Sequence, residues 1–366
     1  MQNEERTFFA AANSGDGFAS FYKEVFGKEG IERRFLIKGG PGTGKSTFMR
    51  RIAQKSLENG LCVDYYRCSS DPESLDAIVI AGRIALIDAT SPHCVEPELV
   101  GARDELVDLG AFWDAERLSC EIDRIKSISE KKKERYRAAY RFLDASMTLD
   151  AHARELAGKL VQREKMLRAV QRIMKRIPRG EGHSVEIGLR DSIGMKGKSS
   201  LDTYEKMADK VYFIRDFYKS GALLLSMLAS EAARNDNAIT VSYYPLDPSY
   251  LDALFFKEAK IAFVLCESEK FESNGDHIYI NMKRFVNPKP TGMSKNEIKE
   301  LKREYKEAVR LSDGLVSSAV EALEGAGQYH FELEKIYKDC MDFTAESELC
   351  ERFAKKIVGM LQKMVF

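Results

Sequence analysis

Three segments of this chain recur in the same order and at nearly constant separation. Three ordered matches indicate a tandem duplication. A length of 366 residues suits two domains of ordinary size. The segment Pro178–Gly182 is rich in proline and glycine and gives the predicted domains 1–178 and 179–366. The matched pairs are 35–38 with 212–215, 71–77 with 247–253, and 83–87 with 260–264.

Each copy has the pattern of an α/β domain with a parallel sheet. Continuous apolar runs such as 84–88 are typical of strands covered on both faces. Charged stretches with apolar residues at three- and four-residue spacing predict long helices in 121–177 and 294–366. The other expected elements are strands 35–38, 61–66, 211–215, 238–244, 260–265 and 277–280, and helices 45–58 and 221–233.

A glycine-rich segment lies between the first of these strands and its helix. It fits the pattern G-x-x-x-x-G-K-[ST] and predicts a phosphate-binding loop. The glycines allow left-handed turns that point successive N–H groups into one nest, and the helix N-terminus adds positive charge. The residues expected to bind nucleotide are Gly39, Gly40, Pro41, Gly42, Thr43, Gly44, Lys45, Ser46 and Thr47.

Two oxygen ligands for Mg²⁺ are expected around this loop. Lys45 should reach the β- and γ-phosphates as a point charge, and the Ser46 hydroxyl should bind the metal. Asp88 ends the apolar run 84–88, where the carboxyl end of a parallel strand would bring a second ligand. The alternative for Asp88 is a capping or turn residue.

The second copy has lost this chemistry. Ala222 and Leu223 stand in place of Lys45 and Ser46, and Leu265 stands in place of Asp88. The glycine-rich stretch has become Asp216-Phe217-Tyr218-Lys219, which puts a negative charge where phosphate should bind. We therefore expect the second copy to keep the fold without nucleotide, in a structural or regulatory role.

On these residues the chain resembles P-loop NTPases. More narrowly, it resembles an uncharacterised bacterial family of tandem P-loop ATPase-like proteins, through four segments. The resemblance implies ATP binding and ATPase activity, and it names no substrate. The segments are Phe8–Asn13, Gly39–Thr47, Ser70–Asp76 and Asp88–His93.

The hydrolytic base is the open part of this assignment. Hydrolytic ATPases of the AAA type place a glutamate directly after the metal-binding aspartate, whereas Ala89 follows Asp88 here. Thr90 is a candidate γ-phosphate sensor, and His93 is a candidate base, with a structural histidine as the alternative. Glu96 and Glu98 are weaker candidates.

Three functions therefore compete. The first is a Mg-dependent ATPase that uses only the N-terminal site. A small-molecule kinase is the second, because a phosphotransferase does not need the missing glutamate. The third is a switch that binds ATP without hydrolysing it. The chain has no N-K-x-D motif for guanine, which favours ATP.

Charge and cysteine content bear on partners and compartment. Net charge is zero, but residues 121–179 carry a net charge of +9 and residues 312–350 a net charge of −7. This difference suggests contact between the two segments, within the chain or between subunits. Contact of the basic segment with nucleic acid, which is less favoured, and two solvated helix faces are the alternatives. Seven scattered cysteines and a polar, acidic start predict a cytoplasmic protein, and no apolar run approaches membrane-spanning length.

Overall fold

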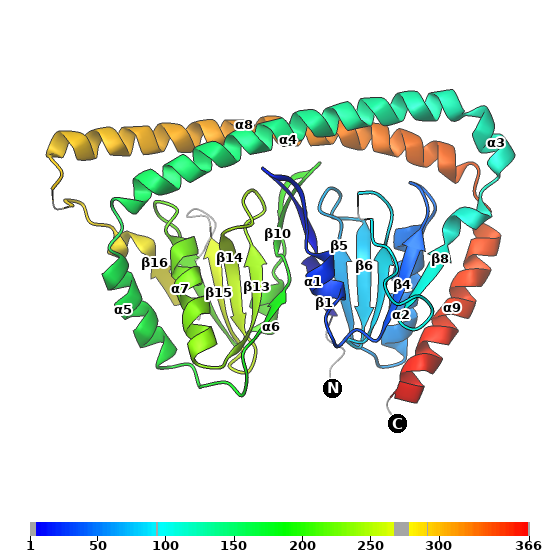
Figure 1. Ribbon diagram of the computed structural model, residues 1–366, viewed down its shortest axis with the longest axis horizontal. Coiled ribbons are helices and arrows are strands. Elements are labelled where there is room, and N and C mark those ends of the chain that lie inside the picture. The colour runs from blue at the N-terminus through cyan, green and yellow to red at the C-terminus, as the bar shows by residue number, and fades with distance from the viewer. Residues whose placement is uncertain (1–4, 93, 267–277, 291, 365–366) are drawn as a thin grey trace.

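The computed structural model of the protein describes residues 5–92, 94–266, 278–290 and 292–364. It contains two α/β domains side by side, with a pair of long helices lying across the same edge of both (Figure 1). Each domain has a six-stranded sheet, and the two sheets have the same strand order. The prediction of an α/β chain with two similar copies is confirmed.

The strands of the two sheets correspond one to one. In the N-terminal sheet the order is β1 (Glu5–Phe9), β5 (Val63–Arg67), β6 (Leu75–Ile80), β7 (Ile84–Asp88), β4 (Arg33–Lys38) and β8 (Asp104–Asp108). In the C-terminal sheet the order is β9 (Ser184–Ile187), β13 (Ala238–Tyr243), β14 (Leu251–Phe256), β15 (Ile261–Cys266), β12 (Lys210–Arg215) and β16 (Ile278–Asn281).

Both sheets are mixed, so the prediction of parallel sheets is wrong. Strand β6 runs antiparallel to both β5 and β7, and β14 does the same in the second sheet. Only three residues join β6 to β7, and two of them, Ala81 and Gly82, have φ of 52° and 67°. A parallel crossover needs a dozen residues or more, so this link can only form a hairpin.

The remaining elements also occur in matching pairs. Two hairpins face each other between the domains. Just before these hairpins in the sequence, Phe9 and Leu189 exchange backbone hydrogen bonds of 2.8 and 3.0 Å. The hairpins are β2 (Ala11–Ser14) with β3 (Gly17–Ser20) and β10 (Asp191–Gly194) with β11 (Gly197–Ser200). The paired helices are α1 (Tyr22–Phe26) with α6 (Thr203–Met207), α2 (Lys45–Glu58) with α7 (Gly221–Arg234), and the 3-10 helices Leu109–Phe112 and Met282–Phe285.

Two long helices connect the domains. After α3 (Ala115–Cys120), helix α4 (Ile122–Gly158) runs antiparallel to α8 (Lys295–Lys338). Apolar side chains fill the seam, and the Ser146 hydroxyl donates to the backbone oxygen of Ser312 at 3.0 Å. No described helix combines the length and apolar character needed to cross a bilayer.

The last helix of each copy packs on the sheet of the other copy. Helix α5 (Arg163–Met174), which lies before the predicted boundary at 178, buries Met166 and Val170 in the core of the C-terminal sheet. Helix α9 (Phe343–Met364) buries Phe353 and Ile357 in the core of the N-terminal sheet, at the far end of the sequence. Each domain is therefore completed by a helix from the other half of the chain.

Candidate functional site

The glycine-rich loop joins the carboxyl end of β4 to the first turn of α2. Strand β4 is held there by apolar side chains, since Phe35 and Ile37 are fully buried. Gly42 and Gly44 have φ of 75° and 81°, conformations that residues with a Cβ rarely adopt. Gly44 is the N-cap of α2, so the N–H groups at the start of this helix follow the loop directly.

Lys45 folds back over the loop. Its ammonium donates to the backbone oxygens of Gly39 and Gly40, both at 2.8 Å, and lies 3.6 Å from Asp88 Oδ2. Both charged side chains are largely buried, at 13% and 15% exposure. The cation is thus held at the mouth of the loop beside the predicted metal-binding carboxylate.

The predicted oxygen ligands lie on neighbouring elements. Asp88 ends β7 and pairs with Ile37 in the register of β4, directly before the loop. The Ser46 hydroxyl, one residue into α2, accepts a hydrogen bond of 3.1 Å from the N–H of Leu75. Hydroxyl and carboxylate oxygens are suitable for Mg²⁺. The described residues contain no cluster of three His, Cys, Asp or Glu side chains able to hold a metal, so Mg²⁺ would also need phosphate or water oxygens.

Thr90 is joined to both parts of this arrangement. Its N–H donates to Asp88 Oδ1 at 2.9 Å, and its hydroxyl donates to the backbone oxygen of Gly39 at 2.8 Å. The other candidate, His93, lies outside the described residues.

The remaining loop residues lie as follows. The Thr43 hydroxyl donates to the backbone oxygen of Gly40 at 2.9 Å, Pro41 is half-buried and Thr47 is exposed.

Sequence reasoning missed one acid in this region, Asp76. Strand β6 pairs Ala77 with Ile87, which places Asp76 beside Asp88 at the end of the sheet. Burial and the Asp76 carboxylate raise the pKa of the Tyr22 hydroxyl. Its counterpart Asp252 is equally buried in the second copy, which lacks the loop chemistry. Because the acid is present in both copies, we assign it to the fold rather than to catalysis.

The junction between α8 and α9 covers the loop. A Cβ added at Gly42 would lie 2.5 Å from the backbone oxygen of Glu334, and one at Gly40 would lie 3.2 Å from the ring of Trp113. The Trp113 ring in turn lies 5.4 Å from that of Tyr337. No local sequence signal predicts these contacts, because they join segments from opposite ends of the chain.

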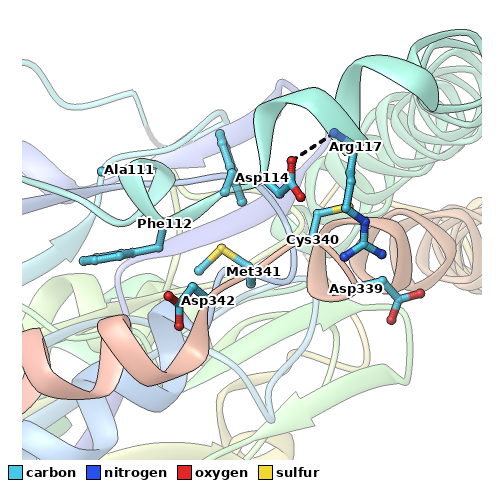
Figure 2. Close-up of a pocket in the computed structure, with 9 residues that line it drawn as sticks. Ala111, Phe112, Asp114, Arg117, Asp339, Cys340, Met341 and Asp342 are labelled. Carbon is cyan, nitrogen blue, oxygen red and sulfur yellow. Dashed lines mark hydrogen bonds between the residues drawn. The ribbon is translucent and has the colours of Figure 1, made fainter.

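A pocket of about 430 Å³ adjoins this cover. Figure 2 shows it between the start of α3, with Asp114 and Arg117, and the α8–α9 junction, with Cys340 and Asp342. Trp113 lines the pocket and also lies against Gly40. None of residues 39–47 lines it, so the pocket lies beside the candidate site and is separate from it.

The corresponding loop of the second copy is filled by its own side chain. Asp216 Oδ1 accepts hydrogen bonds from the N–H groups of Phe217 at 2.7 Å and Gly221 at 2.8 Å. Tyr218 and Lys219 have φ of 56° and 47°, so a left-handed turn remains although the glycines are gone. The Asp216 carboxylate therefore bonds to loop N–H groups in this copy, at the position where its negative charge was expected to replace phosphate.

Comparisons with protein families, with curated proteins and with solved structures give no significant match to this chain. The fold established here is therefore that of two α/β domains with similar mixed six-stranded sheets, and the resemblance to P-loop NTPases rests on the loop and its surroundings.

Proposed function

We propose that the protein binds Mg-ATP through residues 39–47 and hydrolyses it, using the N-terminal site only. The C-terminal copy serves as a structural or regulatory partner. The observation that carries this proposal is the position of the Lys45 ammonium, between two loop carbonyls and 3.6 Å from the Asp88 carboxylate. A turn that only connected a strand to a helix would not require a largely buried cation beside an acid.

Each residue has a role in this proposal. The loop N–H groups and the N-terminus of α2 bind phosphate oxygens, and Lys45 balances the charge that develops on the transferred phosphoryl group. Ser46 and Asp88 would hold Mg²⁺, which when bound neutralises phosphate charge. The Thr90 N–H holds the Asp88 carboxylate in place, and the Thr90 hydroxyl, which donates to the backbone oxygen of Gly39, is the candidate γ-phosphate sensor.

The test is nucleotide turnover with and without Mg²⁺. Replacing Lys45 by alanine should lower the rate of phosphate release by about 100-fold or more, since one transition-state contact is worth that much. Lys55 lies on the same helix and pairs with Glu351 at the surface. Lys55→Ala is therefore the matched control and should retain turnover. Full activity in the Lys45→Ala protein would contradict the proposal.

A second candidate is an ATP-binding switch without turnover. It is favoured by the absence of an acid directly after Asp88, where the chain has Ala89. Retained ATP without released phosphate, in the wild-type protein with Mg²⁺, would select this candidate over hydrolysis. Transfer of phosphate only when an acceptor is added would instead select a kinase.

A further inference from the structure

Helix α4 directs one of its faces toward the N-terminal domain. Lys132, Tyr136 and Tyr140 lie four residues apart on this face. The Tyr140 hydroxyl donates to Asn13 Oδ1 at 2.9 Å, and the Tyr136 hydroxyl bonds to Ser70. These contacts turn the face toward the first domain and place Lys132 one helical turn nearer the start of α4.

Lys132 differs from the lysines on either side of it. Lys131 lies over the Tyr329 ring at 6.0 Å, and Lys133 pairs with Glu130 at 2.7 Å. Lys132 is half-buried, and within the described parts of the chain no hydrogen bond or ion pair is found for its ammonium. Burial lowers its pKa, and the positive charges of Lys133 and Lys45 lower it further.

This arrangement is electrostatically unfavourable as it stands. The positive charge of Lys45 acts on Lys132, and among the described residues no carboxylate pairs with the Lys132 ammonium, whereas the Lys45 ammonium lies 3.6 Å from Asp88 Oδ2. A partly buried cation is normally paired, because removing it from water is costly. An anion between the two lysines would supply the missing charge.

The internal repeat provides an independent comparison. Lys132 is the eleventh residue of α4, and Tyr305 is the eleventh residue of α8. The Tyr305 ring lies 4.7 Å from that of Tyr218, in the degenerate loop. The early part of α8 therefore faces the degenerate loop, and the repeat places the corresponding part of α4, which contains Lys132, on the side of the N-terminal loop. This helix position is Tyr305 in the copy whose loop contains Asp216, and it is Lys132 in the copy whose loop contains Lys45.

We propose that Lys132 binds the terminal phosphate of the nucleoside triphosphate held by the N-terminal loop and so links helix α4 to the nucleotide state. This inference rests on the proposed function. A diphosphate lacks that phosphate, so the contact forms with the triphosphate only. The far end of α4 reaches the second domain, where the Arg154 guanidinium lies 4.0 Å from the Tyr250 ring. The helix can thereby report the nucleotide state to the degenerate copy.

The experiment compares triphosphate with diphosphate affinity. A fluorescent, non-hydrolysable ATP analogue and fluorescent ADP are titrated with Mg²⁺ into the wild-type protein and into Lys132→Ala, Lys132→Arg and Lys133→Ala variants. A charged hydrogen bond is worth about 1.5–3 kcal/mol, or roughly 10- to 100-fold in affinity. Lys132→Ala should lose that much affinity for the analogue and less than about threefold for ADP.

Two controls separate this inference from the proposed function. Lys132→Arg keeps the charge and should recover most of the analogue affinity, whereas Lys133→Ala should bind as the wild type does. Equal analogue affinity in wild-type and Lys132→Ala proteins would overturn the role of Lys132 and leave Lys45 untouched. If the wild-type protein binds neither nucleotide, the proposed function itself fails. Since Lys132→Ala removes a repelled charge, it should fold, and circular dichroism checks this.

Discussion

The packing of α9 on the N-terminal sheet predicts that a substitution at Phe353 will destabilise the N-terminal domain. Phe353 of α9 is 7% exposed, and its ring lies 4.7 Å from Phe35 at 80° and 5.8 Å from Phe48. Replacing a buried phenylalanine by alanine costs about 3–5 kcal/mol through lost burial and the cavity left behind. We expect Phe353→Ala to destabilise the N-terminal domain by this amount.

The assay is urea unfolding followed by fluorescence of the single tryptophan. Trp113 lies beside the loop of the N-terminal domain, so its signal reports on that domain. With a slope of about 2 kcal/mol per molar urea, the loss should lower the midpoint by roughly 1.5–2.5 M. The matched control is Phe331→Ala in α8, which removes an equal side chain that is 49% exposed. Phe331→Ala should change the free energy of unfolding by no more than about 0.5 kcal/mol. Equal midpoints for the two variants would refute the assignment of α9 to the N-terminal core.

Two further predictions concern the fold. Met166 of α5 is fully buried against the C-terminal sheet, so Met166→Ala should cost about 2–5 kcal/mol and speed hydrogen exchange in β12 and β14 more than in β4. Burial opposes ionisation of Asp104, but hydrogen bonds from Arg34 and Arg103 outweigh it and hold the pKa of that carboxyl well below its ordinary value. The stabilisation that ionised Asp104 gives the folded state is fully present above the carboxyl's pKa in the unfolded chain, about 3.9. This stabilisation is lost as the pH falls toward the lower pKa of the folded state. Asp104→Asn removes the carboxylate that accepts two hydrogen bonds from the buried Arg34 and leaves that cation, among the described residues, only Glu98 at 3.3 Å, so it should cost about 3 kcal/mol at pH 7 and flatten the acid unfolding curve.

Local patterns predicted the elements around the site. The run 84–88 and the segment 45–58 form β7 and α2 at those bounds, because a buried strand leaves a short continuous apolar run in the sequence and an amphipathic helix leaves apolar residues at three- and four-residue spacing. The internal repeat likewise predicted two similar sheets. Strand β6 (Leu75–Ile80) was not predicted at all, although the short link through Ala81 and Gly82 contains the signal for a hairpin.

Long-range packing was not predictable in the same way. The apolar stripe of α9 has the same character whichever sheet it covers, so the sequence offered no reason to place Phe353 against Phe35 rather than in the second domain. The close packing of the Glu334 backbone against Gly42 depends on how α4 and α8 align, and so does the position of Lys132. Such alignment is decided by the summed packing of many side chains rather than by one motif.

The most direct test of the account is the number of ATP molecules that one chain binds. Isothermal titration with a non-hydrolysable ATP analogue and Mg²⁺ should give one site per chain in the wild-type protein. That site should disappear in Lys45→Ala and persist in Tyr218→Ala, which alters the degenerate loop. Two sites per chain, or one site that survives Lys45→Ala, would contradict the assignment of nucleotide binding to the N-terminal loop alone.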